Sequence, residues 1–521
     1  MSTETTPRKD LVLPTGAIEY RDTATELFPI LARRHRYFVH GGLIAELGPG
    51  VLLRDKQLHI ALQPLDPDAL RSRIEEDFAV KTWRRHPNDK TKSVLLPARC
   101  PRDTAMVLLK SDHAFRLLPP LHTLSACPVL AGEIGKAEIL SKGYHALNGG
   151  IYVAGGTVTL PQSVGEATGL ITSLLRDFEF ITAGDKARAI AHFLSPALRA
   201  GQLLNRADFP LDLSEANVSQ SGKTLRLKLI HAAYAEQPYL IAYRQGGVGS
   251  IDESISSALI AAKPFITIDN YRGNIDSQIL ETCLRGAGVI GARMPHRGEV
   301  QVPTDHINWQ LSSNGVVGAL DFANRTTITR IQKQPPGYKF HPWPEGNLLA
   351  HIKADQPRIL GAILYLLMQW DRDGRPATKE NRHDFTEWCR ALDWIVQDYF
   401  KCAPLLDGHT EEILRLSNPN LSWLRQVAHA ANRKAKLDSA LQAWEIADLC
   451  ENCDIELGSD RQTPEQHSML AGRKLNSIFN QNDTNQVNVD VYTVRQETKT
   501  YHDAANGTYK EKHYYWFEVR E

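Results

Sequence analysis

The amino-acid sequence predicts an α/β fold built from several domains. Between residues 208 and 345, segments typical of buried strands alternate with segments of helical periodicity, which favours a largely parallel sheet covered by helices. A helical run follows, and the C-terminal region has the order helix, helix, long hairpin. Because one domain commonly holds ~100 to 200 residues, a chain of 521 residues is expected to form about three or four domains.

Residues 1–162 are expected to form a mixed α/β domain. The stretches RYFVHGGLIAEL and QLHIALQPL alternate apolar and polar residues, as half-buried strands do, and NGG and AGGT are turn signals. Residues 1–110 contain no aspartate-rich polymerase motif and no zinc-binding primase signature, so primase activity is not predicted.

Residues 163–345 are predicted to hold the central sheet and the helices that precede it. The helical pattern begins near Ser163 and continues through VGEATGLITSLLRDFEF and DKARAIAHFLSPALRAGQLL. After the loop NVSQSGKT, we expect a helix at LRLKLIHAAYA, a strand at YLIAYRQ, a helix at ESISSALIAA, and strands at PFITIDN and INWQLSSN.

Two further regions follow the proline-rich stretch QPPGYKFHPWPEG. Residues 346–417 are predicted to form a helical subdomain, because RILGAILYLLMQWDRDG and NRHDFTEWCRALDWIVQDYF have apolar residues at helical spacing. Residues 418–521 contain two helical segments, SALQAWEIADLCENC and MLAGRKLNSIFNQ. The β-rich segments VNVDVYTVRQ and KHYYWFEVR follow, joined by a connection that contains an Asn-Gly turn signal. This order is typical of a winged-helix domain.

The composition is that of an ordinary soluble protein. Sixty basic residues balance sixty acidic ones, so the overall charge gives no support for a nucleic-acid partner, and any such contact must come from a local patch. No apolar run approaches the ~20 residues needed to span a bilayer, and the N-terminus lacks a signal-peptide pattern. We expect a cytoplasmic protein without a membrane partner.

Seven cysteines at scattered positions fit a reducing compartment better than a disulfide framework. Cys450 and Cys453 have the spacing of metal ligands. Four ligands are needed for a structural zinc site, however, and no second pair lies nearby in the sequence. Two cysteines near a helix end are the alternative interpretation.

The loop NVSQSGKT resembles the phosphate-binding pattern G-x-x-x-x-G-K-[ST]. Gly222, Lys223 and Thr224 match it, while Asn217 replaces the first glycine. In such a loop, backbone N–H groups at a helix N-terminus surround the phosphate oxygens. Lys223 would reach the β and γ phosphates of ATP, and Thr224 would bind Mg²⁺. The polar residues predicted to complete the loop are Ser219, Gln220 and Ser221. Taken alone, the motif is equally well explained as a surface loop with a lysine.

Further polar residues follow in an order that favours an ATPase. PFITIDN ends in Asp269 and Asn270, and an acid at the end of a buried strand is where ATPases place the carboxylate that organises the metal. Asn314 ends the next strand and would orient the attacking water. Arg325 and Arg330, in DFANRTTITRI, are candidates for an arginine that reaches the nucleotide of a neighbouring subunit. Each residue alone has an ordinary alternative, a turn, a helix cap or a solvated side chain.

This ordered set resembles the AAA+ ATPases of the superfamily 3 helicase type, especially the primase-associated helicases of phages and integrative elements. Three short motifs carry the likeness: the D-N pair at 269–270, the S-N-G step at 313–315 and DFANR at 321–325. The stretches LPPLHTLSACPVLA, GYHALNGGIYV and EWCRALDWI are also similar to segments of these proteins, so that the resemblance covers most of residues 115–400. It implies an AAA+ core with a helical lid.

The resemblance also implies a DNA-binding hairpin within ARMPHRGEVQVPTD, residues 292–305. Superfamily 3 helicases carry a hairpin here whose basic tip follows single-stranded DNA through the pore of a hexamer. Arg293, His296 and Arg297, turning at Gly298, suit that role, because basic side chains in a pore follow the phosphate backbone. A solvated hairpin with a basic turn is the alternative.

Two residues depart from the family pattern. Asn217 stands in place of the loop glycine, and Asn270 follows the metal-organising acid where many ATPases have a catalytic glutamate. Glu253, or Asp252 beside it, is a candidate for the missing carboxylate that polarises water, although acids at a helix start more often interact with the helix dipole.

The leading prediction is an ATP-dependent DNA helicase or translocase of a mobile element or phage, which binds ATP and Mg²⁺, forms a hexameric ring and moves on single-stranded DNA. A primase or another replication protein is an expected partner. Two alternatives remain: a regulatory or antiviral-defence ATPase that does not unwind DNA, and a DNA-binding scaffold with a silent nucleotide site.

Overall fold

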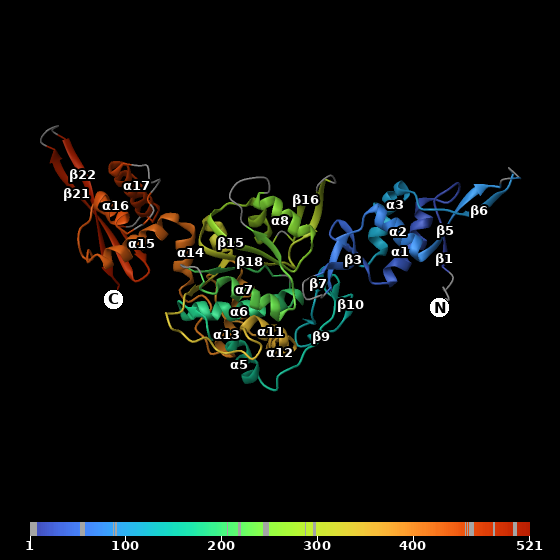
Figure 1. Ribbon diagram of the computed structural model, residues 1–521, viewed down its shortest axis with the longest axis horizontal. Coiled ribbons are helices and arrows are strands. Elements are labelled where there is room, and N and C mark those ends of the chain that lie inside the picture. The colour runs from blue at the N-terminus through green and yellow to red at the C-terminus, as the bar shows by residue number, and fades with distance from the viewer. Residues whose placement is uncertain are drawn as a thin grey trace. The chain divides into compact units, whose positions relative to one another are not determined.

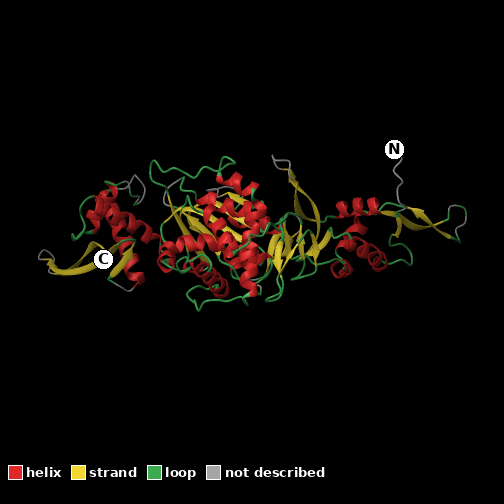
Figure 2. Ribbon diagram, turned by 90° about the horizontal axis from the view of Figure 1, so that it is seen from below, coloured by secondary structure: helices red, strands yellow, loops and turns green. Residues whose placement is uncertain are grey.

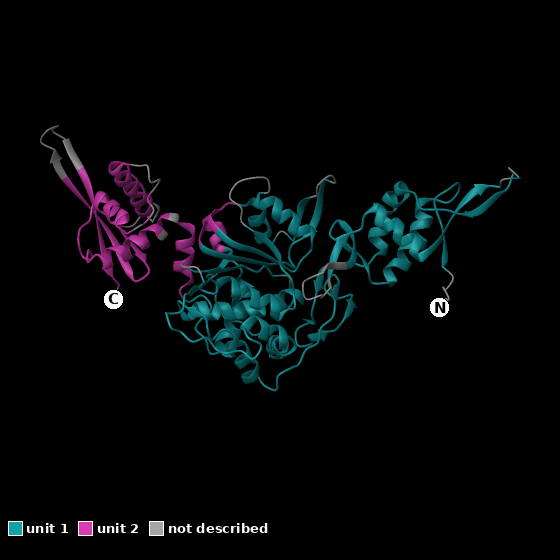
Figure 3. Ribbon diagram, viewed as in Figure 1, with its two compact units in different colours: residues 1–271, 277–314, 325–407 teal, residues 272–276, 315–324, 408–521 magenta. Residues whose placement is uncertain are grey.

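A computed structural model describes residues 8–52, 58–86, 88, 91–205, 207–216, 220–242, 250–286, 288–294, 298–453, 455, 457, 463–482, 485–503 and 508–520. Figure 1 shows the mixed α/β architecture with its elements labelled. The chain divides into two compact units (Figure 3). Unit 1 comprises residues 1–271, 277–314 and 325–407, and unit 2 comprises residues 272–276, 315–324 and 408–521.

The N-terminal part of unit 1 has its own hydrophobic core, which is centred on Leu27, Phe28, Leu70 and Ile74. Two three-stranded sheets have the orders β1-β5-β6 and β2-β3-β4. The strands are β1 (Lys9–Val12), β2 (Tyr37–His40), β3 (Leu43–Leu52), β4 (Leu58–Pro64), β5 (Phe78–Arg85) and β6 (Ser93–Pro97). The helices are α1 (Tyr20–Arg33), α2 (Pro67–Asp77), α3 (Arg102–Leu109) and α4 (Asp112–Leu117).

Short strands connect this part to the central sheet. They form one sheet of order β10-β11-β7 and a β8-β9 pair. Their bounds are β7 (Thr123–Ser125), β8 (Val129–Ala131), β9 (Glu138–Leu140), β10 (Gly143–His145) and β11 (Ile151–Val153). The described residues before α5 thus contain both helices and strands.

The central sheet of unit 1 has six strands in the order β12-β19-β13-β18-β15-β14. β13 runs parallel to both of its neighbours, and β14 runs parallel to β15, while the short β12 is antiparallel to β19. The strands are β12 (Glu179–Phe180), β13 (Leu211–Glu215), β14 (Tyr239–Ala242), β15 (Phe265–Ile275), β18 (Asn308–Gly318) and β19 (Thr326–Gln332). The largely parallel sheet matches the alternation of strand and helix in the sequence.

Helices cover both faces of this sheet, as Figures 1 and 2 show. They are α5 (Val164–Leu174), α6 (Ala183–Ala200), α7 (Lys223–Ala233), α8 (Ile251–Ile260), α9 (Gln278–Leu284), α11 (Leu348–Ala354), α12 (Gln356–Arg372) and α13 (Thr386–Asp398). Buried apolar residues of α5, α6 and α7 share one core with those of α11, α12 and α13. The helices expected as a subdomain therefore pack into the same core as the helices that precede the sheet.

A two-stranded hairpin leaves the sheet between β15 and β18. It consists of β16 (Val289–Met294) and β17 (Gly298–Pro303), which pair antiparallel from Val289↔Pro303 to Met294↔Gly298. The hairpin that the sequence predicts at residues 292–305 is therefore present. Two of the residues predicted at its tip, His296 and Arg297, lie outside the described residues.

Unit 2 has a separate core formed by helices and a three-stranded sheet of order β20-β21-β22. Its elements are α10 (Leu320–Asn324), α14 (His409–Ser417), α15 (Pro419–Arg433), α16 (Ala443–Glu451), α17 (Pro464–Asn482), β20 (Gln486–Val489), β21 (Tyr492–Asp503) and β22 (Thr508–Val519). β21 and β22 pair along their whole length, so that the predicted hairpin is longer than the two β-rich segments alone. Among the described residues, no helix is both long and apolar enough to span a membrane.

Candidate functional site

The candidate site begins at the N-terminus of α7. Gly222 is the N-cap residue and has φ +95°, a left-handed conformation that favours glycine. A Cβ at this position would lie 3.0 Å from Cε1 of Phe178. The loop residue Gln220 is also left-handed, with φ +63°. Backbone angle and close packing therefore both require glycine directly before Lys223.

The predicted loop is described only in part, since Asn217 and Ser219 lie outside the described residues. Within the described part of the chain, the hydroxyl oxygen of Ser221 is buried and has no hydrogen-bond partner. A buried hydroxyl without a partner is costly, so this one suits a ligand that accepts or donates a hydrogen bond.

Two asparagines hold the ammonium group of Lys223. Its Nζ donates a hydrogen bond to Oδ1 of Asn270 at 3.3 Å and another to Oδ1 of Asn314. Asn270 follows Asp269 in β15 and has φ +53°, whereas Asn314 lies in β18. Three predicted site residues from three different elements are thus in direct contact.

Thr224 is part of a second contact group. Its hydroxyl donates to Oδ1 of Asp269 at 3.1 Å and lies 3.4 Å from Oγ of Ser312. Ser312 donates to the same Asp269 oxygen at 2.6 Å and accepts the backbone N–H of Asn270 at 2.8 Å. Ser312 belongs to β18, which lies between β13 and β15 in the sheet. The strand order therefore brings the end of β15 to the first turn of α7.

A buried ion pair anchors α7 to β13. The Arg226 guanidinium contacts the Asp212 carboxylate, and both residues are almost fully buried. Arg226 Nε also donates to Oγ of Ser214 at 3.1 Å, and that hydroxyl donates to the backbone carbonyl of Lys223 at 3.0 Å. These contacts fix the helix start relative to the strand that precedes the loop.

The two predicted arginines occupy different environments. Arg325 is partly exposed, and its Nη1 lies 3.4 Å from the carbonyl oxygen of Glu281. Arg330 is 5% exposed and lies in β19, where it is in register with Glu215 of β13. Because it is buried inside the sheet, Arg330 is poorly suited to reach a neighbouring subunit.

The remaining predicted residues lie apart from these contacts. Glu253 is exposed in the first turn of α8, where its backbone N–H donates to the N-cap residue Ser250. Asp252 accepts a hydrogen bond from Ser277 at 2.5 Å. No hydrogen bond among the described residues joins Glu253 to Thr224 or Asp269. Arg293 is exposed on β16, in register with Glu299 of β17.

The chemistry of these groups fits magnesium and a nucleotide phosphate. The Thr224 hydroxyl and the Asp269 carboxylate are oxygen ligands of the kind that Mg²⁺ prefers, and they already lie side by side. Lys223 provides a cation next to them, and the N-terminus of α7 favours an anion. Among the described residues, no group of three histidine, cysteine or acidic side chains is placed to hold a metal. The donors that would hold Mg²⁺ are thus one hydroxyl and one carboxylate.

Three contributors were not identified from the sequence. Ser312 and Ser214 are buried polar residues on strands. Because a buried polar group needs a hydrogen-bond partner, a serine within an apolar strand was the sequence feature that could have identified them. Phe178 lies against Gly222 in the fold. In the sequence, α6 and β13 separate the two residues, and no sequence pattern links them.

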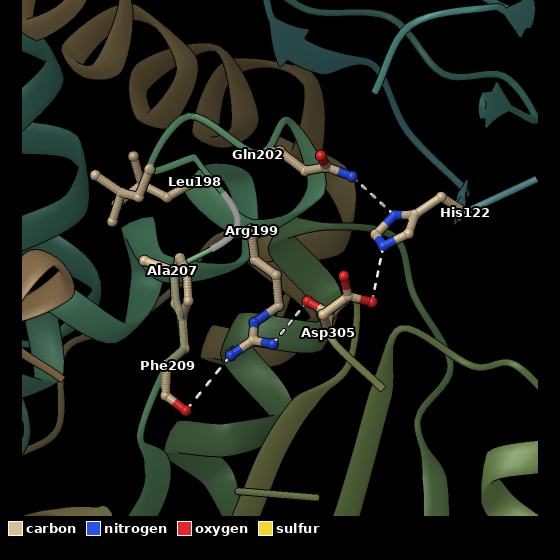
Figure 4. Close-up of a pocket in the computed structure, with 8 residues that line it drawn as sticks. His122, Leu198, Arg199, Gln202, Ala207, Phe209 and Asp305 are labelled. Carbon is tan, nitrogen blue, oxygen red and sulfur yellow. Dashed lines mark hydrogen bonds and ion pairs between the residues drawn. The ribbon is translucent and has the colours of Figure 1, made fainter. Parts of the chain in front are cut away.

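A second polar cluster lies elsewhere in unit 1 (Figure 4). His122 contacts Asp305 at 2.8 Å and Gln202 at 3.0 Å, and Arg199 donates to the Asp305 carbonyl at 2.8 Å. Burial lowers the pKa of Arg199 to about 10. This cluster joins α6 to the segments before β7 and after β17. Nε of Arg199 is buried without a hydrogen-bond partner among the described residues. The other contacts link three segments of unit 1, so we interpret the cluster as structural.

No protein-family model matches the sequence, and no curated protein does. The fold has low similarity to solved structures. Two structures of the NrS-1 C-terminal region in the apo A form have TM-scores of 0.34 and 0.32 and identities of 10% and 11%. The matched regions cover 83% and 80% of this chain, and 92% and 90% of the respective NrS-1 chains. A structure described as SCCmec type IV Cch, active helicase, has a TM-score of 0.30 at 10% identity, covering 84% of this chain and 99% of that one. At such TM-scores, functional assignment depends on the site residues themselves.

Proposed function

We propose that the protein is an ATPase of the DNA helicase or translocase type. The observation that carries this proposal is the convergence of Lys223 and Thr224 with Asp269, Asn270 and Asn314. A cation, a hydroxyl, a carboxylate and an amide near a helix N-terminus are groups that ATPases use to bind the phosphates and Mg²⁺ and to position water. The largely parallel sheet with the loop after β13 supports the same proposal.

Each residue has a defined role in this proposal. Lys223 binds the β and γ phosphates, for which it must leave the two asparagine oxygens that hold it. Thr224 and Asp269 would hold Mg²⁺, which would neutralise charge on the phosphate oxygens. Asn314 orients the attacking water in line with the γ phosphate. Asn270 holds Lys223 in place before the nucleotide binds.

The oligomeric part of the proposal concerns residues outside this contact group. Arg325 acts in trans on the nucleotide of the next subunit in a hexameric ring, with Arg330 the less suitable candidate because of its burial. The β16–β17 hairpin, with Arg293, His296 and Arg297, follows single-stranded DNA in the pore. A primase or other replication protein is a proposed partner.

A silent nucleotide site is the competing function, and a specific observation favours it. The residue after Asp269 is an amide, and Glu253 is exposed on α8 without a contact to the site in the described part of the chain. If no carboxylate outside the described residues polarises water, the protein is a DNA-binding scaffold. A regulatory or antiviral-defence ATPase that does not unwind DNA is the intermediate case.

Steady-state ATP hydrolysis with and without single-stranded DNA, together with strand displacement, separates these functions. We expect hydrolysis that DNA stimulates and that Lys223→Ala abolishes, and displacement of a paired strand. Asn217→Gly is the matched control and should retain hydrolysis, because glycine is the residue of the loop pattern. If single-stranded DNA does not change the rate of ATP hydrolysis and no strand is displaced, the helicase assignment is contradicted. Equal background rates in the parent and in Lys223→Ala favour the scaffold.

A further inference from the structure

The β5–β6 hairpin extends beyond the core of the N-terminal part of unit 1 (Figure 1). The first residues of β5, Phe78 and Val80, are buried in that core. The last residues, Trp83, Arg84 and Arg85, are exposed and pair only with β6. The outer half of this hairpin therefore contributes little to the core.

An exposed tryptophan lies in this outer half. Side chains alternate between the two faces of a strand, so Trp83 shares a face with Lys81 and Arg85. Trp83 is opposite Leu95 of β6 but still keeps 42% of its surface exposed. An exposed indole on a strand that has left the core is an apolar surface available for contact with a flat partner.

The arginines in the N-terminal part of unit 1 differ in whether they have an acidic partner. Those with a partner form the pairs Arg34–Asp77, Arg36–Glu46, Arg71–Asp68, Arg73–Glu46 and Arg102–Asp68. Among the described residues, the exposed Arg21 and Arg116 on helices have none. Lys81 is paired with Asp10 at 2.5 Å. Arg84 and Arg85 have no acidic partner among the described residues. Two guanidinium groups without an acidic partner in the described part of the chain therefore lie beside the exposed indole, Arg85 on the same face of the strand and Arg84 on the other.

We propose that this hairpin binds single-stranded nucleic acid, in addition to the proposed nucleotide site and the proposed pore hairpin. Arg84 and Arg85 contact backbone phosphates, and one unpaired base stacks on Trp83. Adjacent cations and an aromatic face are the combination that single-strand binding uses, because every base has a π face and every nucleotide carries a charge. A duplex offers the phosphates but keeps its bases stacked, so the indole favours a single strand.

The test is equilibrium binding of labelled dT20 and U20 to the full chain in the absence of ATP. Fluorescence anisotropy measures this binding at several salt concentrations. Arg84→Gln/Arg85→Gln should weaken binding roughly tenfold at low salt and reduce the slope of log K against log salt by about 1.4, since each single-strand phosphate contact contributes ~0.7. Trp83→Ala should weaken binding about fivefold or more at an unchanged slope, because stacking is worth ~1–3 kcal/mol per base. Trp83→Phe should retain most of the affinity.

Arg21→Gln/Arg116→Gln is the matched control, because it removes the same charge from exposed helix positions in the same part of the chain. It should leave the slope unchanged. The proposal is overturned if this control weakens binding as much as the hairpin double variant, or if neither hairpin variant has an effect. It is also overturned if Trp83→Ala weakens binding of a 20-base-pair duplex by as large a factor as it weakens binding of dT20. ATP hydrolysis without DNA should be unaffected in all these variants, so a failure of the nucleotide site would be recognised separately.

Discussion

At the scale of single residues, the candidate site depends on one serine that joins three parts of it. The Ser312 hydroxyl donates to Asp269, accepts from the backbone N–H of Asn270 and lies near the Thr224 hydroxyl. It thereby fixes the carboxylate that is proposed to hold Mg²⁺. Groups that orient metal ligands commonly matter nearly as much as the ligands themselves.

Ser312→Ala should lower steady-state ATP hydrolysis roughly 10- to 100-fold without unfolding the chain, because Asp269 loses the donor that orients it. The control is Ser313→Ala, one residue further along β18, where the hydroxyl donates instead to the Tyr271 carbonyl at 2.8 Å. Hydrolysis should survive this second change. Equal rates in the parent and Ser312→Ala would show that Ser312 does not position the site.

At the scale of secondary-structure elements, α7 is tied to β13 by the buried Arg226–Asp212 pair. Each of the two charged groups also has a buried atom without a hydrogen-bond partner in the described part of the chain. These atoms are Nη1 of Arg226 and Oδ2 of Asp212. Breaking a buried ion pair is costly because one charge remains unpaired, while replacing both partners by apolar residues is often tolerated.

Arg226→Met should therefore reduce the free energy of unfolding of unit 1 by about 3–5 kcal/mol. The double variant Asp212→Leu/Arg226→Met should lose less than the single one, since no unpaired charge is left. Urea denaturation followed by circular dichroism measures both. A double variant that is destabilised by the sum of the two single changes would contradict this role of the pair.

The sequence predicted most elements but not all of their limits. PFITIDN was expected to end at Asn270, yet β15 continues to Ile275, because the left-handed Asn270 interrupts the pattern without ending the strand. β18 likewise passes Asn314. Apolar periodicity placed α12 and α13 correctly, but a periodic pattern shows only that a helix has a buried face. That this face packs against α5 and α6 follows from contacts distant in sequence.

The candidate site was predictable to a similar extent. Lys223, Thr224 and Asp269 are recognised by motif and strand position, whereas Ser312 is one polar residue in a buried strand whose partners only the sheet order reveals. Trp83, Arg84 and Arg85 gave no signal either, because exposure and missing acidic partners are properties of the folded chain.

At the scale of the whole molecule, the buried core of unit 1 includes several histidines whose protonation affects stability. Burial lowers the pKa of His192, His231 and His383 from 6.5 to about 4 in each case. A histidine kept neutral in the folded state binds fewer protons than it does when unfolded. Its contribution to stability is therefore complete above the unfolded pKa and is lost as the pH falls.

We expect the midpoint of thermal unfolding of unit 1 to decrease as the pH falls from about 6.5 toward 4. His231→Gln should show a smaller decrease than the parent, because one of the three groups no longer titrates. Differential scanning calorimetry at several pH values measures this dependence. A midpoint that is constant or rises over this range would rule out neutral histidines in the core.

We propose that the N-terminus of α7 binds Mg²⁺-ATP through Lys223 and Thr224. The most direct measurement is calorimetric titration of ATP in the presence of Mg²⁺ into the parent protein and into Lys223→Ala. We expect saturable binding to the parent that is abolished in Lys223→Ala and weakened when Mg²⁺ is removed from the parent. Equal affinity of the parent and Lys223→Ala for ATP would contradict it.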